Sequence, residues 1–253
     1  MSILSNCEIK CNCGETFEAE VWKAVNVFDD PDLKDVILSG RFNTVECPHC
    51  KKVFYHEHFF MYQDLQNELI ALNATYPDAI AWLVVPNTNI DTPVFQGKDN
   101  NRYLRTDRDG NSAFWGETFL DYDSKIDFSG YTNLVVYGHN TTTDDHFTPL
   151  EKYLDKNFYE NNKEIEMATL TGNYKWMIFS VFKTTSDNYN DFYIDTNFLN
   201  DQEFNDFIYH FKTRSMYESN VEVTKDDDIL TLSTCEYSQN NGRLVIMAKL
   251  IRK

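Results

Sequence analysis

The chain has 253 residues, of which 42% are hydrophobic and 15% aromatic, and its formal net charge is −17 at pH 7. This length is sufficient for one large domain or two smaller ones, each with its own core. The acidity argues against a nucleic-acid-binding surface, because binding to phosphates needs clustered Lys and Arg. No apolar run reaches the length of a membrane-spanning helix, and no signal peptide is visible at the start. We therefore expect a protein inside the cell, or one at a membrane whose anchor is not visible in this chain.

The cysteines are unevenly distributed along the sequence. Five of the six lie within the first fifth of the chain, and Cys235 lies far beyond them. A disulfide framework would spread its pairs through a small secreted domain. The pattern instead predicts a metal site near the N-terminus, followed by one reactive or structural thiol.

Two short motifs, C-N-C-G at residues 11–14 and C-P-H-C at residues 47–50, predict the metal site. Each is typical of a tight turn that presents two thiolates, and four such ligands satisfy the tetrahedral preference of Zn²⁺. A structural zinc ion would crosslink a segment too small to be stable alone. The expected zinc ligands are Cys11, Cys13, Cys47 and Cys50. Four protein ligands leave no open coordination position, so we expect no catalytic zinc. Reduced cysteines without metal and disulfides are the alternatives.

The rest of this first segment predicts two helices. Asp30-Pro31 is typical of a helix start, and Ser39-Gly40 of a helix end. A second helix is indicated by apolar residues at helical spacing. These residues are Tyr62, Leu65, Leu69 and Leu72.

The order of these motifs resembles that of a known family. The first cysteine pair is followed by VNVFDDPDLKDVILSGRFN, CPHC and FFMYQDLQ, which is similar to the CpXC domain, a small zinc-ribbon-like module. The resemblance covers residues 8–70 and implies metal binding rather than catalysis. We therefore assign residues 1–72 to a CpXC-like zinc-binding domain with a connecting helix.

Residues 73–253 contain a series of short apolar and β-branched runs separated by loops. Strands are expected at residues 80–85, 90–95, 113–121, 133–137, 167–171, 176–184, 229–235 and 244–251. The polar stretch 97–112 predicts loops, Gly172-Asn173 predicts a turn between two strands, and Pro93 predicts an edge position. Many short strands with few helices indicate a closed or nearly closed β-barrel.

Two helices are expected among these strands. Phe147, Leu150 and Tyr153 indicate a short one that packs on the sheet. Asn200 begins the clearest helix of the chain, with Glu203 three residues later as in a capping box. Its apolar stripe, which predicts core packing, consists of Phe204, Phe207, Ile208 and Phe211. The expected fold class is mainly β with helices (α+β).

Three of the expected strands lie next to residues that can carry out chemistry. The strand at 229–235 ends in Cys235, the strand at 133–137 is followed by His139, and Arg243 precedes the strand at 244–251. If these strands are neighbours, a thiol, an imidazole and a guanidinium meet at one end of the sheet. Such a set predicts acyl transfer by a thiol nucleophile.

Each of the three groups has a distinct expected role. Only a thiolate attacks a carbonyl, and roughly 3% of a thiol with an ordinary pKa is ionised at pH 7. His139 could raise that share and protonate the leaving amine. Arg243 stays charged, so it is expected to hold the substrate and stabilise the oxyanion. Without these partners, Cys235 would be a small buried apolar residue.

Several strings in residues 73–253 resemble the sortases, the cysteine transpeptidases of Gram-positive cell surfaces. They are NLVVYGHN, FTPLEKYLDKNFYENN, YKWMIFSVF and DDDILTLSTCEYSQNNGRLVIMAKL. The helix expected around residues 200–215, before the cysteine strand, is similar to class B. The resemblance implies a sortase-type β-barrel in which Cys235 is the nucleophile, His139 the general acid and base, and Arg243 the family's arginine. It implies no cofactor for catalysis.

The resemblance also implies a substrate, an acceptor and a groove. Such enzymes cleave a sorting signal after Thr, keep its acyl group as a thioester, and transfer it to an amine of peptidoglycan or a pilin. Ser233, Thr234 and Glu236 would border the substrate groove, and Tyr193 and Ile194 would lie in a loop that forms its wall.

Two other functions stay open on the sequence. A non-catalytic adaptor protein could keep the barrel as a scaffold, and a hydrolytic thiol peptidase would release the acyl group to water. The location is also open. The family implies the cell surface, whereas a zinc site of reduced thiolates is more typical of the cytoplasm.

Overall fold

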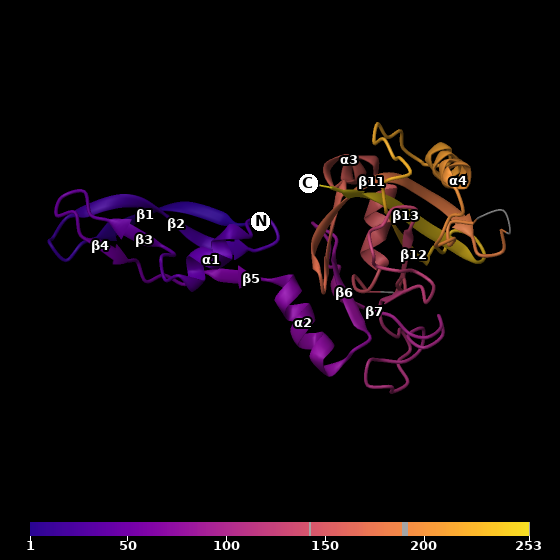
Figure 1. Ribbon diagram of the computed structural model, residues 1–253, viewed down its shortest axis with the longest axis horizontal. Coiled ribbons are helices and arrows are strands. Elements are labelled where there is room, and N and C mark those ends of the chain that lie inside the picture. Colours follow the sequence, from indigo (N-terminus) through magenta and orange to yellow (C-terminus); the bar gives the residue numbers. More distant parts are fainter. Residues whose placement is uncertain (142, 189–191, 253) are drawn as a thin grey trace. The chain divides into compact units, whose positions relative to one another are not determined.

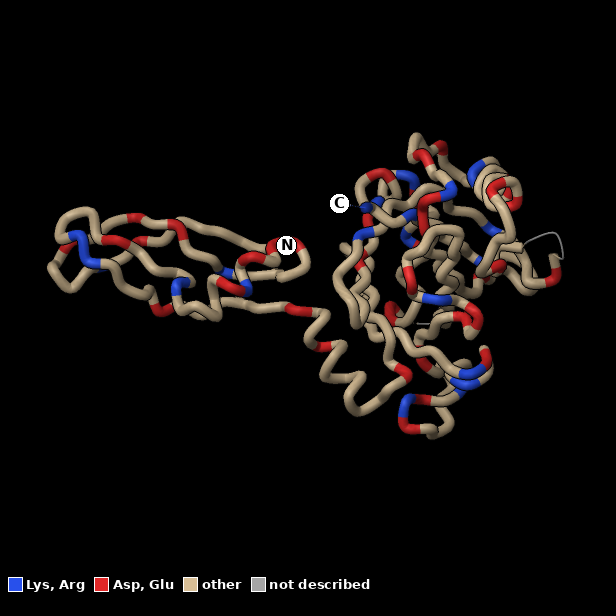
Figure 2. The backbone as a smooth tube through the Cα atoms, viewed as in Figure 1, with Lys and Arg blue, Asp and Glu red and all other residues tan. Residues whose placement is uncertain are grey.

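The computed structural model describes residues 1–253 except 142, 189–191 and 253. The chain divides into two compact units, Met1–Glu68 and Leu69–Lys253, both drawn in Figure 1. The division lies in helix α2 (Leu65–Thr75), and the domain boundary expected after residue 72 falls in the same helix. Figure 2 shows acidic residues spread over both units.

The first unit is built on a small sheet. Within the described residues, β2 (Thr16–Asn26) pairs antiparallel with β1 (Ile3–Lys10) and parallel with β5 (Met61–Gln63). A separate hairpin is formed by β3 (Thr44–Glu46) and β4 (Val53–Tyr55). The buried apolar residues form small clusters around Val21 and Val25. A core of this size is marginal for a segment of this length, so a further crosslink would matter for its stability.

The first predicted helix is confirmed and the second is partly wrong. Helix α1 (Asp32–Leu38) follows Pro31 and is followed by Gly40 at a φ of +70°. Tyr62, expected in the second helix, belongs to β5. The reason is local: Asp64 accepts a hydrogen bond from the N–H of Asn67 (3.2 Å), which caps α2 and starts it after Tyr62.

The second unit is a closed β-barrel. Among the described residues its strand order is β10-β11-β13-β12-β9-β8-β7-β6. The strands are β6 (Ala79–Val84), β7 (Asp91–Phe95), β8 (Phe119–Leu120), β9 (Asn133–Tyr137), β10 (Glu164–Thr169), β11 (Gly172–Thr185), β12 (Ile229–Cys235) and β13 (Gly242–Ile251). The helical segments are a 3-10 helix (Thr148–Leu154), α3 (Lys156–Asn161) and α4 (Asp201–Thr213). The predicted mainly β fold with a sortase-type barrel is confirmed.

Two local strand predictions differ from the structure. The strand expected at 113–121 is reduced to Phe119–Leu120, because the chain turns at Gly116, whose φ is +53°. The turn between β10 and β11 lies before Gly172 rather than at it. Thr169 closes that turn by accepting a hydrogen bond from the N–H of Thr171 (3.2 Å).

The edge position predicted from Pro93 is wrong, because β7 lies between β6 and β8. Pro93 is the register partner of Trp82 on β6. On the other side, β8 pairs with β7 only at Phe95 within the described residues. The missing N–H of proline therefore interrupts no ladder there.

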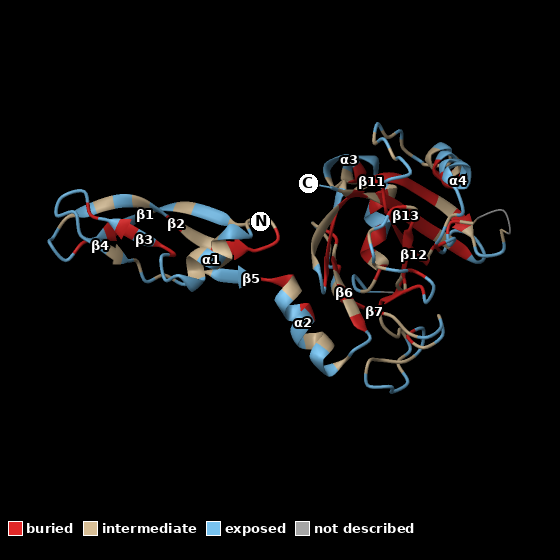
Figure 3. Ribbon diagram, in the orientation of Figure 1, coloured by how far each residue is buried: buried red, intermediate tan, exposed pale blue. Residues whose placement is uncertain are grey.

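Helix α4 covers part of the outer face of the barrel. Its capping box is present, since the Asn200 side chain accepts from the N–H of Glu203 (3.1 Å). Its buried residues pack with outward-facing residues of the sheet, and the cluster includes Phe204, Phe207, Ile208, Phe211, Ile229, Val245 and Met247. Figure 3 shows the barrel strands as largely buried. The apolar stripe of α4 is thus core packing, as predicted.

None of the helices in the described part of the chain combines the length and the apolar composition needed to span a bilayer.

Candidate active site

The three strands expected to converge are neighbours in the barrel. Strand β12 lies between β9, to which it is parallel, and β13, to which it is antiparallel. Cys235 and Arg243 are register partners across β12 and β13. The parallel pairing brings the end of β9 to the same edge of the sheet, with Tyr137 beside Ser233. The predicted adjacency of the three strands is confirmed.

Cys235 and Arg243 face outward from the barrel. Alternate residues of the same strands, Leu232 and Leu244, belong to the interior core. Because side chains alternate between the faces of a strand, Cys235 and Arg243 lie on the outer face. This is the face that α4 covers further along β12 and β13, so the helix leaves the two functional residues at the end of the sheet.

The segment around His139 is fastened to the cysteine strand by hydrogen bonds. The N–H of Gly138 donates to the carbonyl of Ser233 (3.2 Å), and the Thr234 hydroxyl donates to the carbonyl of Gly138 (2.7 Å). On the other side of the histidine, Asn140 Nδ2 donates to the carbonyl of Cys235 (2.9 Å). His139 is therefore held at the end of β9, directly beside the strand end that carries the thiol.

The imidazole of His139 is positioned by the loop at residues 97–118. Its Nε2 lies 2.9 Å from the carbonyl oxygen of Leu104, and the Trp115 ring lies 5.7 Å from the imidazole between centroids. Burial lowers the pKa of His139, and the charges of Arg105 and Arg243 act in the same direction. The Leu104 carbonyl opposes this shift without reversing it. The imidazole is thus mainly neutral at pH 7 and available as a base.

The other two groups are a half-buried free thiol and a guanidinium with spare donors. Cys235 is intermediate in exposure. Arg243 Nη1 donates to the carbonyls of Gly242 (2.9 Å) and Asn241 (3.4 Å). No carboxylate of the described residues lies within ion-pair distance of Arg243. Its remaining N–H groups are therefore free to bind a substrate carbonyl or an oxyanion.

The residues expected to border the groove differ in exposure. Ser233 and Thr234 are each 2% exposed, and the Ser233 hydroxyl contacts the Tyr193 hydroxyl at 3.2 Å. Tyr193 is buried as well, whereas Ile194 is 47% exposed. The side chains of Ser233, Thr234 and Tyr193 thus support the wall of the site, and Ile194 offers an apolar surface.

Glu236 is buried next to the thiol and is satisfied by other residues. It is 5% exposed and accepts from Lys183 Nζ (2.8 Å) and from the Ser238 hydroxyl (2.7 Å). Burial would raise the pKa of Glu236, but the bonds from Lys183 and Ser238 outweigh it and hold the pKa below its ordinary value. The carboxylate therefore stays ionised at pH 7 and braces the turn after Cys235.

Several residues at the site were not singled out by the sequence. Leu104 and Trp115 reach His139 from a loop far away in sequence. Tyr237 donates from its hydroxyl to the carbonyl of Asn140 (2.6 Å). Asn140 follows His139 directly, and this adjacency is the one signal in the sequence that could have drawn attention to it.

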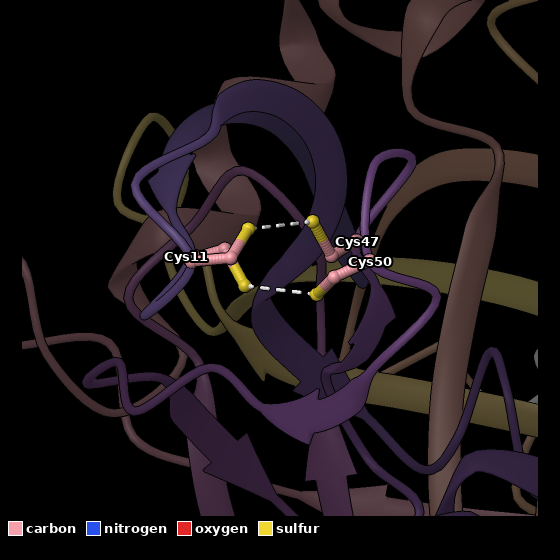
Figure 4. A group of neighbouring side chains, drawn as sticks. Cys11, Cys47 and Cys50 are labelled. Atoms are coloured by element: carbon pink, nitrogen blue, oxygen red, sulfur yellow. Dashed lines mark hydrogen bonds between the residues drawn. The ribbon is translucent and has the colours of Figure 1, made fainter.

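The predicted metal ligands form a separate cluster in the first unit. The four sulfur atoms of Cys11, Cys13, Cys47 and Cys50 all lie within 4.8 Å of one another, among the residues that the structure describes. Figure 4 shows Cys11 pointing toward Cys47 and Cys50. The distance is 3.6 Å between the sulfurs of Cys11 and Cys50, and 3.7 Å between those of Cys13 and Cys47. A tetrahedral zinc with Zn–S bonds of about 2.3 Å needs sulfurs about 3.8 Å apart. The cluster can therefore hold a metal ion.

Two tight turns create this cluster. The N–H of Gly14 bonds to the carbonyl of Cys11 (2.9 Å), with Gly14 at a φ of +96°. The N–H of Lys51 bonds to the carbonyl of Cys47 (3.0 Å), with Lys51 at a φ of +59°. Each turn directs two thiols to the same side, as the spacing of the motifs predicted.

Comparisons with known proteins find two families along the chain. Residues 9–93 match the model of the CpXC protein family, and residues 83–251 match the model of the sortase domain. Sortase B of Listeria monocytogenes is 37% identical over 75% of this chain and 76% of its own length. Sortase B of Staphylococcus aureus is 38% identical over 69% of this chain and 71% of its own length.

Solved structures agree with these relatives. The Staphylococcus aureus sortase B–substrate complex aligns with a TM-score of 0.68 and 35% identity, over 75% of this chain and 87% of that chain. The crystal structure of sortase B complexed with triglycine aligns with a TM-score of 0.67 and 36% identity, over 74% of this chain and 87% of that chain.

Proposed function

The chain belongs to the sortase family and is a cysteine transpeptidase of the sortase B type, and we propose that Cys235, His139 and Arg243 perform its chemistry. The observation that carries this assignment is the placement of the three residues. Cys235 and Arg243 are paired in register, and hydrogen bonds on both sides of His139 tie its backbone to the cysteine strand. No other described thiol lies near an imidazole and a guanidinium in this way.

The first half-reaction forms a thioester. The Cys235 sulfur attacks the carbonyl carbon of the scissile peptide bond while the thiol proton passes to the imidazole of His139. The carbonyl oxygen becomes an oxyanion, which the free N–H groups of Arg243 stabilise. The C–N bond then breaks, and His139 gives its proton to the leaving amine.

The second half-reaction transfers the acyl group. An acceptor amine attacks the thioester carbon and loses a proton to the neutral His139. The C–S bond breaks, and the sulfur regains a proton from the imidazole. The product is a new amide, so the bond energy of the donor peptide is conserved in the thioester between the two steps.

The donor is a sorting-signal peptide, and the acceptor is an amine. Relatives of the same type have been crystallised with a substrate and with triglycine, which supports binding of both partners. We assign cleavage after Thr and transfer to an amine of peptidoglycan or to a pilin Lys. The groove is bordered by Ser233, Thr234 and Glu236, with Tyr193 and Ile194 in its wall. We propose that the reaction takes place at the cell surface of a Gram-positive bacterium, where such acceptors are found.

We further assign zinc to the cysteine cluster of the first unit, within a CpXC-like domain at residues 1–72, ahead of a catalytic domain at 73–253. The sulfur separations of 3.6 and 3.7 Å fit a tetrahedral ion, and an all-thiolate donor set favours zinc over Mg²⁺ or Ca²⁺. The ion would be structural, since its four protein ligands leave no position for water or substrate.

The assignment is tested by trapping the thioester. The full chain is incubated with a library of Thr-containing sorting-signal peptides and analysed by intact-protein and peptide mass spectrometry. We expect an acyl adduct on Cys235, and its loss in Cys235→Ala. In His139→Ala, alkylation of Cys235 by a peptide vinyl sulfone should also be lost.

The acceptor step separates the remaining alternatives. Adding triglycine should convert the adduct into a longer peptide, with transpeptidation exceeding hydrolysis. Release to water alone would make the chain a thiol peptidase. Absence of any adduct, with peptide binding retained, would instead indicate an adaptor.

A further inference from the structure

The carbonyl of Leu104 determines which nitrogen of His139 carries a proton. It lies 2.9 Å from Nε2 of the imidazole. A carbonyl oxygen only accepts hydrogen bonds, so Nε2 must be the nitrogen with the hydrogen. In the neutral imidazole, Nδ1 is then the free base. One backbone atom of the loop thereby selects the nitrogen that can exchange a proton.

Gly116 allows that carbonyl to reach the histidine. A Cβ on Gly116 would collide with the carbonyl oxygen of Tyr103, and it would lie 2.8 Å from both the carbonyl carbon and the oxygen of Leu104. The φ of Gly116 is +53°, which also favours glycine. The N–H of the next residue, Glu117, donates to the Tyr103 carbonyl at 2.9 Å. The two sides of the loop therefore approach each other more closely than any residue with a side chain permits.

Further contacts hold this loop in one conformation. The N–H of Ala113 donates to the carbonyl of Arg105 (3.0 Å), and the Arg105 guanidinium donates to the carbonyl of Phe114. Trp115, next to Gly116, packs on the imidazole of His139. Both the carbonyl that binds the imidazole and the ring that packs on it are thus placed by the turn at Gly116.

We infer that Gly116 is a positioning residue for the transpeptidation, because it seats the Leu104 carbonyl against Nε2–H of His139 and fixes the tautomer whose Nδ1 takes protons from the thiol and the acceptor amine. The inference rests on the proposed role of His139 as the general acid and base. Gly116 itself touches no reacting atom.

The charged and titratable groups around His139 come from several elements. Arg105 lies on the same loop, His146 on the segment after β9, Arg243 on β13, and Cys235 on β12. Burial, Arg105, His146 and Arg243 all lower the pKa of His139, and the Leu104 carbonyl is the contact that raises it. Loss of that carbonyl should therefore lower the pKa further, because the imidazolium loses the acceptor of its Nε2–H.

The test combines NMR with kinetics on the full chain. Multiple-bond ¹H–¹⁵N spectra of histidine-labelled wild type should show His139 as the Nε2–H tautomer. In Gly116→Ala, we expect a mixture of tautomers, a lower His139 pKa, and kcat reduced about tenfold to a hundredfold. KM for the peptide should change little, and the limb of the pH–rate profile that follows His139 should move to lower pH.

Gly110→Ala is the matched control. Gly110 lies on the same loop at a φ of +86°, but nothing lies within 4 Å of the Cβ that would be added. This variant carries a similar backbone strain without displacing the carbonyl. Its His139 tautomer, pKa and pH–rate profile should match those of the wild type.

Two results would overturn the inference. One is an Nδ1–H tautomer in the wild type, which can be observed even if Gly116→Ala does not fold. The other is a folded Gly116→Ala whose tautomer and pH profile are those of the wild type. If no transpeptidation occurs at all, the proposed function fails, whereas the tautomer of His139 is still decided by NMR.

Discussion

Arg243 keeps its charge beside the reactive thiol without an acidic partner among the described residues. The chain has 40 Asp and Glu against 23 Lys and Arg, so a basic side chain without a carboxylate neighbour is notable. Its contacts to the carbonyls of Gly242 and Asn241 orient the guanidinium and leave other donors free. At this position a positive charge is useful only when the substrate supplies the negative one.

We therefore expect Arg243→Lys to reduce kcat/KM by about a hundredfold to a thousandfold, because Lys keeps the charge but loses the planar fork of donors. The measurement is the initial rate of transpeptidation with a peptide identified by the adduct experiment. Arg252→Lys, just beyond the end of the same strand, is the control and should leave the rate unchanged. An Arg243→Lys variant as active as the wild type would show that charge alone suffices.

At the scale of elements, the turn between β12 and β13 sets the spacing of the site. The N–H of Glu236 donates to the carbonyl of Gly242 (2.9 Å), which closes the turn directly behind the Cys235–Arg243 pair. Lys183 on β11 reaches across to the Glu236 carboxylate (2.8 Å). This ion pair ties a third strand to the turn and thus stabilises the register that makes Cys235 and Arg243 neighbours.

Breaking this pair should make stability depend on pH. Lys183→Met leaves the carboxylate of Glu236 buried without its cation, and we expect a loss of about 1–3 kcal/mol at pH 7, less than for a fully buried pair because Lys183 is 32% exposed. In the wild type the pKa of Glu236 is held below its ordinary value. The pair therefore stabilises the fold above that ordinary value, and the contribution disappears as the pH falls through the folded-state pKa.

Urea unfolding of wild type and Lys183→Met at pH 7 and at low pH measures this effect. The difference in free energy of unfolding should shrink as the pH is lowered. Lys156→Met, which removes an exposed pair with Glu160, is the control and should be close to neutral at both pH values. A difference that stays constant with pH would mean that Lys183 acts through packing alone.

The sequence was informative about the elements and much less about the contacts between them. Strands β9, β12 and β13 could be predicted because apolar and β-branched runs stand out locally. Their adjacency placed Cys235 and Arg243 correctly. The Leu104 carbonyl could not be predicted, since a backbone acceptor has no signature in the side-chain sequence and reaches His139 only after the loop closes. The strand expected at 113–121 failed for the same reason: the apolar run there carries Gly116, and its turn serves the tertiary contact.

At the scale of the whole molecule, the two compact units are stabilised by different means. The unit Leu69–Lys253 has the extensive core of a closed barrel. The unit Met1–Glu68 has only small apolar clusters, and its four clustered thiols join the turn at residues 11–14 to the turn at residues 47–50. A zinc ion bound there would supply much of the folding free energy of the first unit and none of the chemistry of the second.

Removal of the metal should therefore unfold the first unit and leave transpeptidation largely intact. We expect one zinc per chain by elemental mass spectrometry, and its loss in the double variant Cys13→Ser/Cys50→Ser. Cys7→Ser is the matched control, because Cys7 lies in the same unit but outside the cluster and should retain the ion. After chelation, hydrogen exchange should lose protection in peptides from residues 1–68 and keep it in the barrel strands, while the rate of thioester formation on Cys235 stays close to that of the zinc-bound chain. Full protection of residues 1–68 without metal would show that the small clusters suffice, and zinc retained by the double variant would place the ion elsewhere.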